Sequence, residues 1–437
     1  MLLEAGGRDL AQKMKEAWES EDGYIYQLRP KRTTGDFQCR VQKQEIGNKR
    51  PEDGEGKVLM LVGATGAGKS TLVNGIVNYA YRVQYGDDFR LKLINEVENE
   101  GTKADSQTEW ITAYQIVKQQ GIAFPYTLTV IDTPGFGGTQ GIKKDHELKD
   151  QIQEFFSHGG HFGVDQLHGI GLVVPASEER LTPSLKYVLD SIMSVFGNDV
   201  KNNIFLLVTF AGMEKPLVRT AVRAANIPFR KMFQFNNSAL FSQDKDNPFN
   251  QAFWDMGTQN FQEFFLEFQH TSPVSLTLTK EVLQRRRLVE ETLQDTKSKL
   301  DAGVSYSALD RLELLREAHA AVRQHGGKLF LRYAKFLPGL NHADLTSSSH
   351  DEHVLKKLTK DFNQERETIF QLTEKAHECK RRLNDIAMKP DHFEIAEYIN
   401  MLIDAEEFDN RPGSTQRIKY LKEAREKAEF AKQAKPV

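Results

Sequence analysis

A glycine-rich run that ends in lysine and serine carries the clearest chemistry in this chain. Residues 63–70 read GATGAGKS and fit the pattern G-x-x-x-x-G-K-[ST]. In such a loop, backbone N–H groups turn inward around phosphate, the lysine reaches the β- and γ-phosphates, and the hydroxyl binds Mg²⁺. The pattern therefore predicts a loop that binds a nucleoside triphosphate. The residues expected in contact with it are Gly63, Ala64, Thr65, Gly66, Ala67, Gly68, Lys69, Ser70 and the adjoining Thr71.

The elements needed to position this loop are both predicted. The apolar run KVLMLV at residues 57–62 indicates a buried strand, and STLVNGIVNY at residues 70–79 indicates a helix. The N-terminus of a helix favours an anion through its partial positive charge and its unpaired N–H groups. Because strand, loop and helix follow in the required order, a chance glycine-rich turn is a poor explanation.

A second motif follows downstream. Asp132-Thr133-Pro134-Gly135 comes directly after the strand-like run YTLTVI, residues 126–131. We expect the Asp132 carboxylate to join the Mg²⁺ shell and the Gly135 N–H to sense the γ-phosphate. A phosphate-binding loop followed by this motif is typical of GTPases and argues against nucleotide kinases.

The metal shell of a GTPase also needs a threonine between the two motifs. The candidates are Thr102, Thr108 and Thr112, in or just after the polar segment 95–107. We favour Thr108, because it ends the polar segment immediately before the strand-like run at 110–117. The predicted metal ligands are Ser70, Thr108 and Asp132, and the residues expected to act on the triphosphate are Lys69, Thr108 and Gly135.

The motif that selects guanine is incomplete. It reads [NT]-K-x-D after a later strand, and here Thr209 fits its first place, whereas Phe210 replaces the lysine and Gly212 replaces the aspartate. Glu214 is the nearest carboxylate that could substitute. Loss of one buried hydrogen-bonding group can cost orders of magnitude in specificity. The residues therefore leave open a GTPase and an ATPase or promiscuous NTPase.

Several further motifs carry a family resemblance. They are Phe136 after the second motif, Ser106 with Thr108, the box Arg180-Leu181-Thr182, and the run FNNSA at residues 235–239. Together they resemble the septin-like branch of P-loop GTPases, and within it the AIG-type, immunity-associated GTPases. The resemblance covers roughly residues 57–270. It implies GTP/GDP and Mg²⁺ as cofactors and base contacts from Asn237 and Ser238.

The rate of hydrolysis is expected to be low. Phe136 stands where Ras-like enzymes carry a glutamine that orients water, and a phenyl ring cannot do this. The resemblance implies nucleotide-dependent homodimerisation as the remedy, with Arg180 as one candidate for assistance, although a structural salt bridge is the simpler role for Arg180. A further alternative is a scaffold that holds nucleotide without significant turnover.

The arrangement of apolar runs predicts three parts. Residues 1–56 are expected to form a lead-in segment. Residues 57–270 alternate strand and helix signals, which predicts an α/β P-loop domain of three layers with a mostly parallel sheet. Residues 278–437 predict an all-α extension, with an apolar stripe at three- and four-residue spacing from Leu355 to Ile386 that suits a bundle or a coiled coil. This helical part is a candidate surface for a protein partner.

Composition limits the remaining function classes. Among 437 residues the net charge is −3, so no overall field favours nucleic acid. No run approaches the ~20 apolar residues of a transmembrane helix. The chain has only Cys39 and Cys379, which excludes a disulfide framework and leads us to expect a cytoplasmic protein.

Overall fold

The computed structural model describes residues 10–18, 20, 22–47, 56–94, 108–137, 142–244, 247–304 and 348–389, and the isolated positions 403, 418, 419, 422, 425 and 426. The chain divides into two compact units. Unit 1 comprises Met1–Leu283 and Ile386–Lys389, and unit 2 comprises Gln284–Asp385 and Pro390–Val437.

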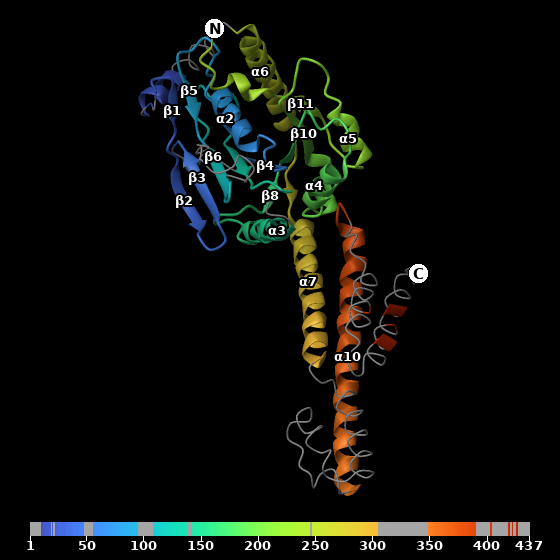
Figure 1. The fold of residues 1–437 in the computed structure, drawn as a ribbon. Helices are drawn as coiled ribbons and strands as arrows, with labels where there is room; N and C mark the ends of the chain where they lie inside the picture. The colour runs from blue at the N-terminus through green and yellow to red at the C-terminus, as the bar shows by residue number, and fades with distance from the viewer. Residues whose placement is uncertain are drawn as a thin grey trace. The chain divides into compact units, whose positions relative to one another are not determined.

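An eight-stranded sheet forms the centre of unit 1 (Figure 1), in the order β11-β10-β9-β4-β7-β6-β3-β2. Neighbouring strands are parallel except for the pairs β6–β7 and β2–β3. The mostly parallel sheet predicted from the sequence is confirmed, and β6 and β7 form an antiparallel hairpin within it. The strands are β2 (Lys31–Asp36), β3 (Val41–Ile46), β4 (Lys57–Gly63), β6 (Ile111–Ile116), β7 (Leu128–Asp132), β9 (Gly169–Pro175), β10 (Ile204–Thr209) and β11 (Met232–Gln234).

Helices cover both faces of this sheet. One buried cluster joins the sheet to α3 (Ile142–Ser157), α4 (Pro183–Met193) and α5 (Val218–Ala224). The other joins it to α2 (Lys69–Ala80) and α6 (Pro248–Phe268). Helix, sheet and helix thus form three layers, as predicted. The smaller elements are β1 (Ile25–Gln27), β5 (Arg90–Lys92), β8 (Gln166–Leu167), β12 (Val274–Ser275) and the 3₁₀ turns η2 (Asn198–Asn203) and η3 (Asn237–Ala239).

The N-terminal segment is part of the domain, which corrects the prediction of a lead-in over residues 1–56. β3 pairs in parallel with β6, and β2 forms the edge of the sheet. Within β3 only the end residues Val41 and Ile46 are fully buried, and most of β2 is exposed. An edge strand that covers little apolar surface needs few apolar residues, so this pair gives almost no hydrophobic signal in the sequence.

Unit 1 also extends beyond the predicted limit at residue 270. β12 pairs with β8, and the side chains of Leu276, Val282 and Leu283 are buried. The chain returns to unit 1 much later, where the Met388 N–H donates to the Phe196 carbonyl at 3.0 Å. This second contribution lies over a hundred residues away in sequence, and no local pattern indicates it.

The described part of unit 2 is helical. α7 (Thr277–Val304) begins in unit 1 and continues into unit 2, and α10 spans Ser348–Ile386. On α10 the predicted stripe includes the buried residues Ala376, Cys379, Leu383 and Ile386. Beyond residue 389 the predicted all-α extension lies mostly outside the described residues. Among the described helices none is long and apolar enough to cross a membrane.

Candidate nucleotide-binding site

The glycine-rich loop connects β4 to α2 at the carboxyl end of the sheet's central strand. Gly66 and Gly68 have φ angles of +74° and +82°, a region that favours glycine. Gly68 is the N-cap of α2, no side chain caps the helix there, and its first turn has no acidic residue. These features leave the N-terminal N–H groups of α2 directed at the loop, where they favour an anion.

Lys69 is buried within the loop that it follows. Its side chain is 6% exposed, and Nζ donates to the carbonyl oxygens of Ala64 at 2.9 Å and Gly63 at 3.4 Å. Burial lowers the pKa of Lys69 to about 8, against the opposing effect of the Asp132 carboxylate. The energetic cost of a buried ammonium falls when an anion binds beside it, so the geometry suits a phosphate.

Three oxygen-bearing side chains from three segments meet beside the lysine. The Ser70 hydroxyl donates to Oδ2 of Asp132 at 2.9 Å, and Oγ1 of Thr108 lies 3.2 Å from Ser70 Oγ. Asp132 is 1% exposed at the end of β7, which pairs with β4. Hydroxyl and carboxylate oxygens are the ligands that Mg²⁺ prefers, so the residues present fit this ion.

Of the three candidate threonines, the structure brings only Thr108 to Ser70 within the described residues. Thr112 lies in β6, is 4% exposed, and its hydroxyl accepts from Nε2 of Gln42 at 3.1 Å. Thr102, like Ser106, falls outside the described residues. Thr71 lies in the first turn of α2, next to Ser70.

The second motif runs alongside the glycine-rich loop. The Thr65 N–H donates to the Phe136 carbonyl at 2.9 Å, and the Phe136 N–H donates to the Gly63 carbonyl at 3.1 Å. A Cβ atom on Gly135 would lie 2.4 Å from Thr65 Cα, so no other residue fits there without displacing the loop. The Phe136 side chain is fully buried and belongs to the apolar cluster that joins the sheet to α3, α4 and α5.

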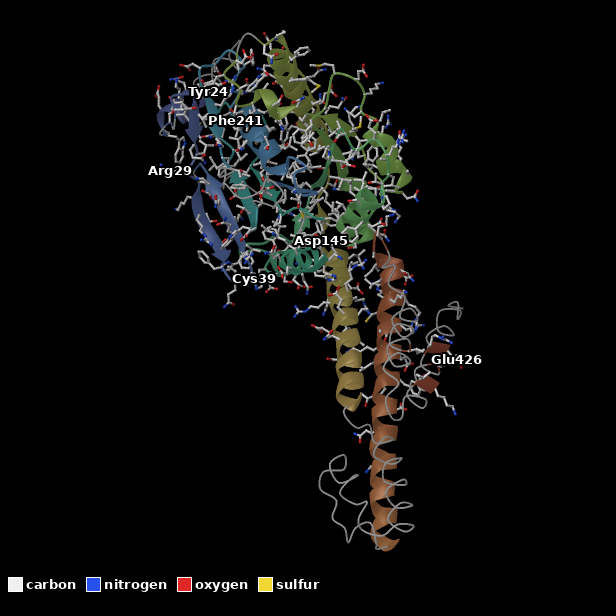
Figure 2. The ribbon with its side chains drawn as sticks, viewed as in Figure 1. Tyr24, Arg29, Cys39, Asp145, Phe241 and Glu426 are labelled. Atoms are coloured by element: carbon white, nitrogen blue, oxygen red, sulfur yellow. The ribbon has the colours of Figure 1, made fainter. Side chains whose placement is uncertain are left out.

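Asp145 anchors the chain just after this motif, a role that the sequence did not reveal. It lies on α3 and is 3% exposed (Figure 2). Its Oδ1 accepts from the Gly137 N–H at 3.0 Å, and its Oδ2 accepts from the Tyr187 hydroxyl at 2.9 Å. An acidic residue in the first turn of a helix usually needs no special explanation, so its position gave no signal.

The loops expected to read the base follow β10 and β11. Thr209 is buried and its hydroxyl donates to the Ala67 carbonyl at 2.7 Å, so this side chain supports the glycine-rich loop. Phe210 has a φ of +51°, is 61% exposed, and its ring lies 3.5 Å from the Cβ position of Gly68. The Glu214 side chain is exposed.

Asn236 ties these two loops together. Its Nδ2 donates to the Ala211 carbonyl at 2.9 Å, and its Oδ1 accepts from the Ser238 N–H at 3.1 Å. Asn237 is half-buried, with Oδ1 3.1 Å from the Cβ position of Gly75 on α2. The sequence run that contains these residues was singled out, but the linking role of Asn236 was missed.

The Arg180-Leu181-Thr182 box serves the fold at one of its positions. The Thr182 hydroxyl caps α4 by accepting from the Leu185 N–H at 3.2 Å. Arg180 is exposed and forms no ion pair with any other described residue. The structural salt bridge expected as its simpler role is therefore absent from this part of the molecule.

Comparison with known protein families gives a match over the region that contains the glycine-rich loop and the second motif. The family model described as Septin matches residues 54–158, which include β4, the glycine-rich loop, the β6–β7 hairpin and the second motif. This part of the chain is a P-loop domain of the GTPase type. The match covers about a quarter of the sequence.

Other similarities are weaker. A DNA translocase FtsK from Halalkalibacterium halodurans is 25% identical over 192 residues, which are 40% of this chain and 22% of that protein. The chain thus spans about a fifth of that relative's length. Crystal structures of Toc33 from Arabidopsis thaliana, in complex with GDP and Mg²⁺ and with Mg²⁺ and GMPPNP, are 15% and 14% identical. Each of these two matches covers 50% of this chain and 87% of Toc33, with a TM-score of 0.33. The assignment of the fold therefore rests on the sheet order of this chain and not on these matches.

Proposed function

We propose that this chain is a Mg²⁺-dependent GTPase of the AIG type that binds GTP and GDP. The observation that carries the proposal is the meeting of Ser70, Thr108 and Asp132 beside the buried Lys69. Nucleotide is bound by the glycine-rich loop and Lys69, and Mg²⁺ is held by the three oxygens. When bound, Mg²⁺ supplies positive charge against the phosphates. The AIG-type assignment rests on the resemblance of the later motifs.

The second motif is proposed to act as the switch. Gly135 lies against Thr65 of the glycine-rich loop, and its N–H is the group that would sense the terminal phosphate of a nucleotide bound there. Thr65 and Phe136 are joined by the hydrogen bond described above. A phosphate that competes for the Thr65 N–H would weaken this link and shift the segment, and this makes the segment sensitive to the nucleotide state.

Hydrolysis by one copy is proposed to be slow, because the buried Phe136 offers no group that orients water. A second copy of the chain, docked across the nucleotide face, is the proposed source of the missing group, and exposed Arg180 is one candidate. The helical unit is proposed as a surface for a protein partner. Cys39 and Cys379 are both free thiols, which suits a cytoplasmic protein.

Direct titration tests this proposal. Nucleotide-stripped protein is titrated with GDP, GTP, ADP and ATP, each with Mg²⁺ and with EDTA. We expect tighter binding of GDP and GTP, and a loss of GTP affinity in EDTA. Absence of binding to any of the four nucleotides would falsify the assignment, and turnover that rises with protein concentration separates an enzyme from a nucleotide-bound scaffold.

A second candidate is an ATPase or promiscuous NTPase. The observation that favours it is the exposed ring of Phe210 over Gly68, at the place where guanine readers carry lysine. An aromatic face stacks on any base and does not distinguish guanine from adenine. Equal affinity for ADP and GDP in the same titration would select this candidate.

A further inference from the structure

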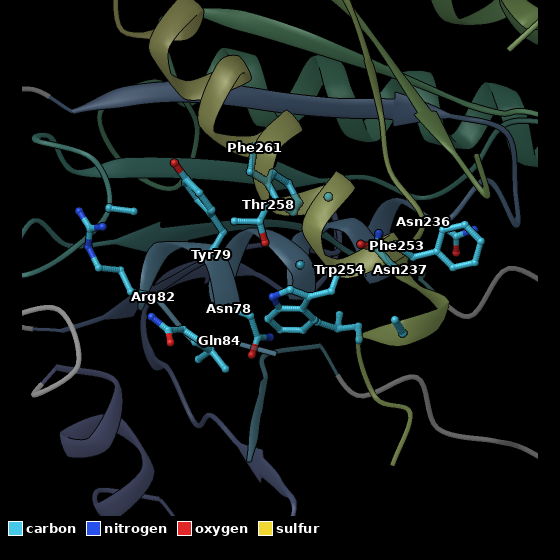
Figure 3. Close-up of a pocket in the computed structure, with 16 residues that line it drawn as sticks. Asn78, Tyr79, Arg82, Gln84, Asn236, Asn237, Phe253, Trp254, Thr258 and Phe261 are labelled. Atoms are coloured by element: carbon cyan, nitrogen blue, oxygen red, sulfur yellow. The ribbon is translucent and has the colours of Figure 1, made fainter. Parts of the chain in front are cut away.

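A cavity of about 190 Å³ lies within unit 1, between α2 and α6 and beside the loop after β11 (Figure 3). On α2 it is lined by one face, which includes Gly75 and Tyr79, with Arg82 just after the helix, and on α6 by residues that include Trp254 and Gly257. None of the residues of the glycine-rich loop lines it. The cavity is therefore separate from the phosphate site.

Gly257 keeps this cavity open. It is buried in the middle of α6, where glycine costs roughly 1 kcal/mol relative to alanine. A Cβ atom on Gly257 would meet nothing within 4 Å, so close packing does not explain the glycine. Gly75 differs, because a Cβ there would lie 3.1 Å from both Asn237 and Phe261. Glycine at 75 lets the two helices approach, whereas glycine at 257 leaves space.

The aromatic side chains that line the cavity, Tyr79 and Trp254, are held in place by contacts with neighbouring residues. The Tyr79 ring stacks on Phe265 with centroids 5.5 Å apart and an interplanar angle of 8°. The Trp254 ring lies 4.4 Å from the guanidinium of Arg90, which is 1% exposed and donates to the carbonyls of Phe89 at 2.7 Å and Tyr85 at 2.9 Å. Fixed walls favour binding because little side-chain freedom is lost when a ligand enters.

The charge of the lining selects an anion. Among the lining residues, all in the described part of the chain, Arg82 is the only charged one. Arg82 is exposed at the edge of the cavity, and its Nε donates to the Gly121 carbonyl at 2.9 Å. Asn236 and Asn237 lie toward the other end, as Figure 3 shows.

We propose that this cavity is a second small-molecule site, for a planar aromatic anion such as an aromatic carboxylate. The ring system lies between the walls of Tyr79 and Trp254, and the carboxylate pairs with Arg82. The volume suits one or two fused rings, since a dry protein cavity of about 150 Å³ holds benzene.

This site is coupled to the nucleotide site through a shared segment. Asn236 and Asn237 line the cavity and also belong to the loop expected to contact the base. A ligand that contacts these residues changes the free energy of the base loop. Nucleotide must then change the affinity for that ligand by the same factor.

The test uses 2-naphthoate as the probe and the full chain without nucleotide, observed by ligand-detected NMR. Gly257→Leu fills the cavity and is expected to weaken binding at least tenfold, whereas Gly257→Ala, which adds one methyl group, retains most of it. Arg82→Gln is expected to remove the preference for 2-naphthoate over neutral 2-naphthalenemethanol. Thermal unfolding establishes that each variant is folded.

Two results would overturn the proposal. One is equal binding of 2-naphthoate to the wild-type chain and to a folded Gly257→Leu variant. The other is strict competition, in which the apparent Kd for 2-naphthoate rises in proportion to GDP concentration without limit, because the probe would then occupy the base position of the nucleotide itself. A change that saturates supports two coupled sites. The first measurement needs no nucleotide, so it stands apart from the proposed GTPase function.

Discussion

At the scale of single residues, the proposed role of Thr108 as a metal ligand depends on the position of its hydroxyl group. Its hydroxyl is 3.2 Å from that of Ser70, and this position gives the sharpest residue-level prediction for the metal. Thr108→Ala removes one proposed ligand and is expected to weaken Mg²⁺-dependent GTP binding by about 1–2 kcal/mol, roughly tenfold in Kd. GDP affinity measured in EDTA should stay unchanged.

Thr112→Val is the matched control, because that side chain also loses a hydroxyl but lies in β6 and bonds to Gln42. Fluorescence titration with labelled GTP and GDP, with and without Mg²⁺, measures all four affinities. If Thr108→Ala lowers GDP affinity in EDTA as much as GTP affinity in Mg²⁺, the residue is not a metal ligand.

Phe210 and Gly212 replace the lysine and aspartate of the guanine-selecting motif, and this gives a prediction about the choice of base. The double substitution Phe210→Lys with Gly212→Asp restores the guanine-reading pattern and is expected to raise the ratio of GTP to ATP affinity at least tenfold, because a buried carboxylate can reject the wrong base. A Cβ on Gly212 would meet nothing within 4 Å, so the aspartate fits. Phe210→Ala alone should weaken both nucleotides alike, by about 1–3 kcal/mol for a lost stacking partner.

Isothermal titration of both variants with GTP and ATP measures these ratios. An unchanged ratio in the double variant, with the fold intact, would show that the loop after β10 does not reach the base. The sequence alone could identify this gap but could not locate the Phe210 ring, since its place over Gly68 depends on a left-handed backbone and on the pairing of β9, β10 and β4.

At the scale of elements, the central strands and their helices follow from the sequence, and the edge does not. β4, β9 and β10 are buried on both faces and read as unbroken apolar runs, which makes them easy to predict. β2 and β3 carry polar residues at most positions, so the sequence predicts only a lead-in there. For the site, the fixed spacing of the glycine-rich loop predicts the phosphate contacts from the sequence, whereas the link between the two loops expected to read the base depends on Asn236, whose partner Ala211 follows a different strand.

This link between the two loops gives a prediction that distinguishes contacts with the base from contacts with the phosphates. Asn236→Ala removes the amide that joins Ala211 to Ser238, so the two base loops are no longer held together. GDP affinity is expected to fall by about 1–2 kcal/mol for the lost hydrogen bonds, while pyrophosphate affinity stays the same. Calorimetric titration with GDP and with pyrophosphate measures both.

Asn247→Ala is the matched control for that change. Asn247 is the N-cap of α6, where its side chain also accepts from a nearby backbone group, the Phe249 N–H, at 3.0 Å. Its substitution should lower stability without changing the ratio of GDP to pyrophosphate affinity. If Asn236→Ala lowers the affinity for GDP and for pyrophosphate equally, the variant perturbs the glycine-rich loop rather than the loops expected to read the base.

At the scale of the whole molecule, the chain leaves unit 1 after Leu283 and returns for four residues, Ile386–Lys389. This return is anchored by side-chain contacts as well as by backbone hydrogen bonds. Lys389 Nζ lies 3.2 Å from Asp190 and donates to the Ala225 carbonyl at 2.7 Å. The hundred residues between are thus tied to unit 1 at both ends, and the second tie depends on a partly buried ion pair.

That ion pair predicts how stability changes with pH. Burial raises the pKa of Asp190, but its bonds with Lys186 and Lys389 outweigh this and hold the pKa below the ordinary value of 3.8. A carboxylate whose pKa is lowered by folding stabilises the fold above pH ~4, and the stabilisation is lost as pH falls through the folded value. Asp190→Asn should therefore cost about 1–2 kcal/mol at pH 7, and its difference from wild type should shrink toward pH 3. Urea unfolding at several pH values measures the free energy of unfolding, and hydrogen exchange of residues 386–389 reports on the return segment itself.

Asp165→Asn is the control, because it removes a more exposed ion pair with Lys280 and should change the free energy of unfolding little. A loss for Asp190→Asn that is the same at pH 7 and pH 3 would assign the effect to packing instead of charge.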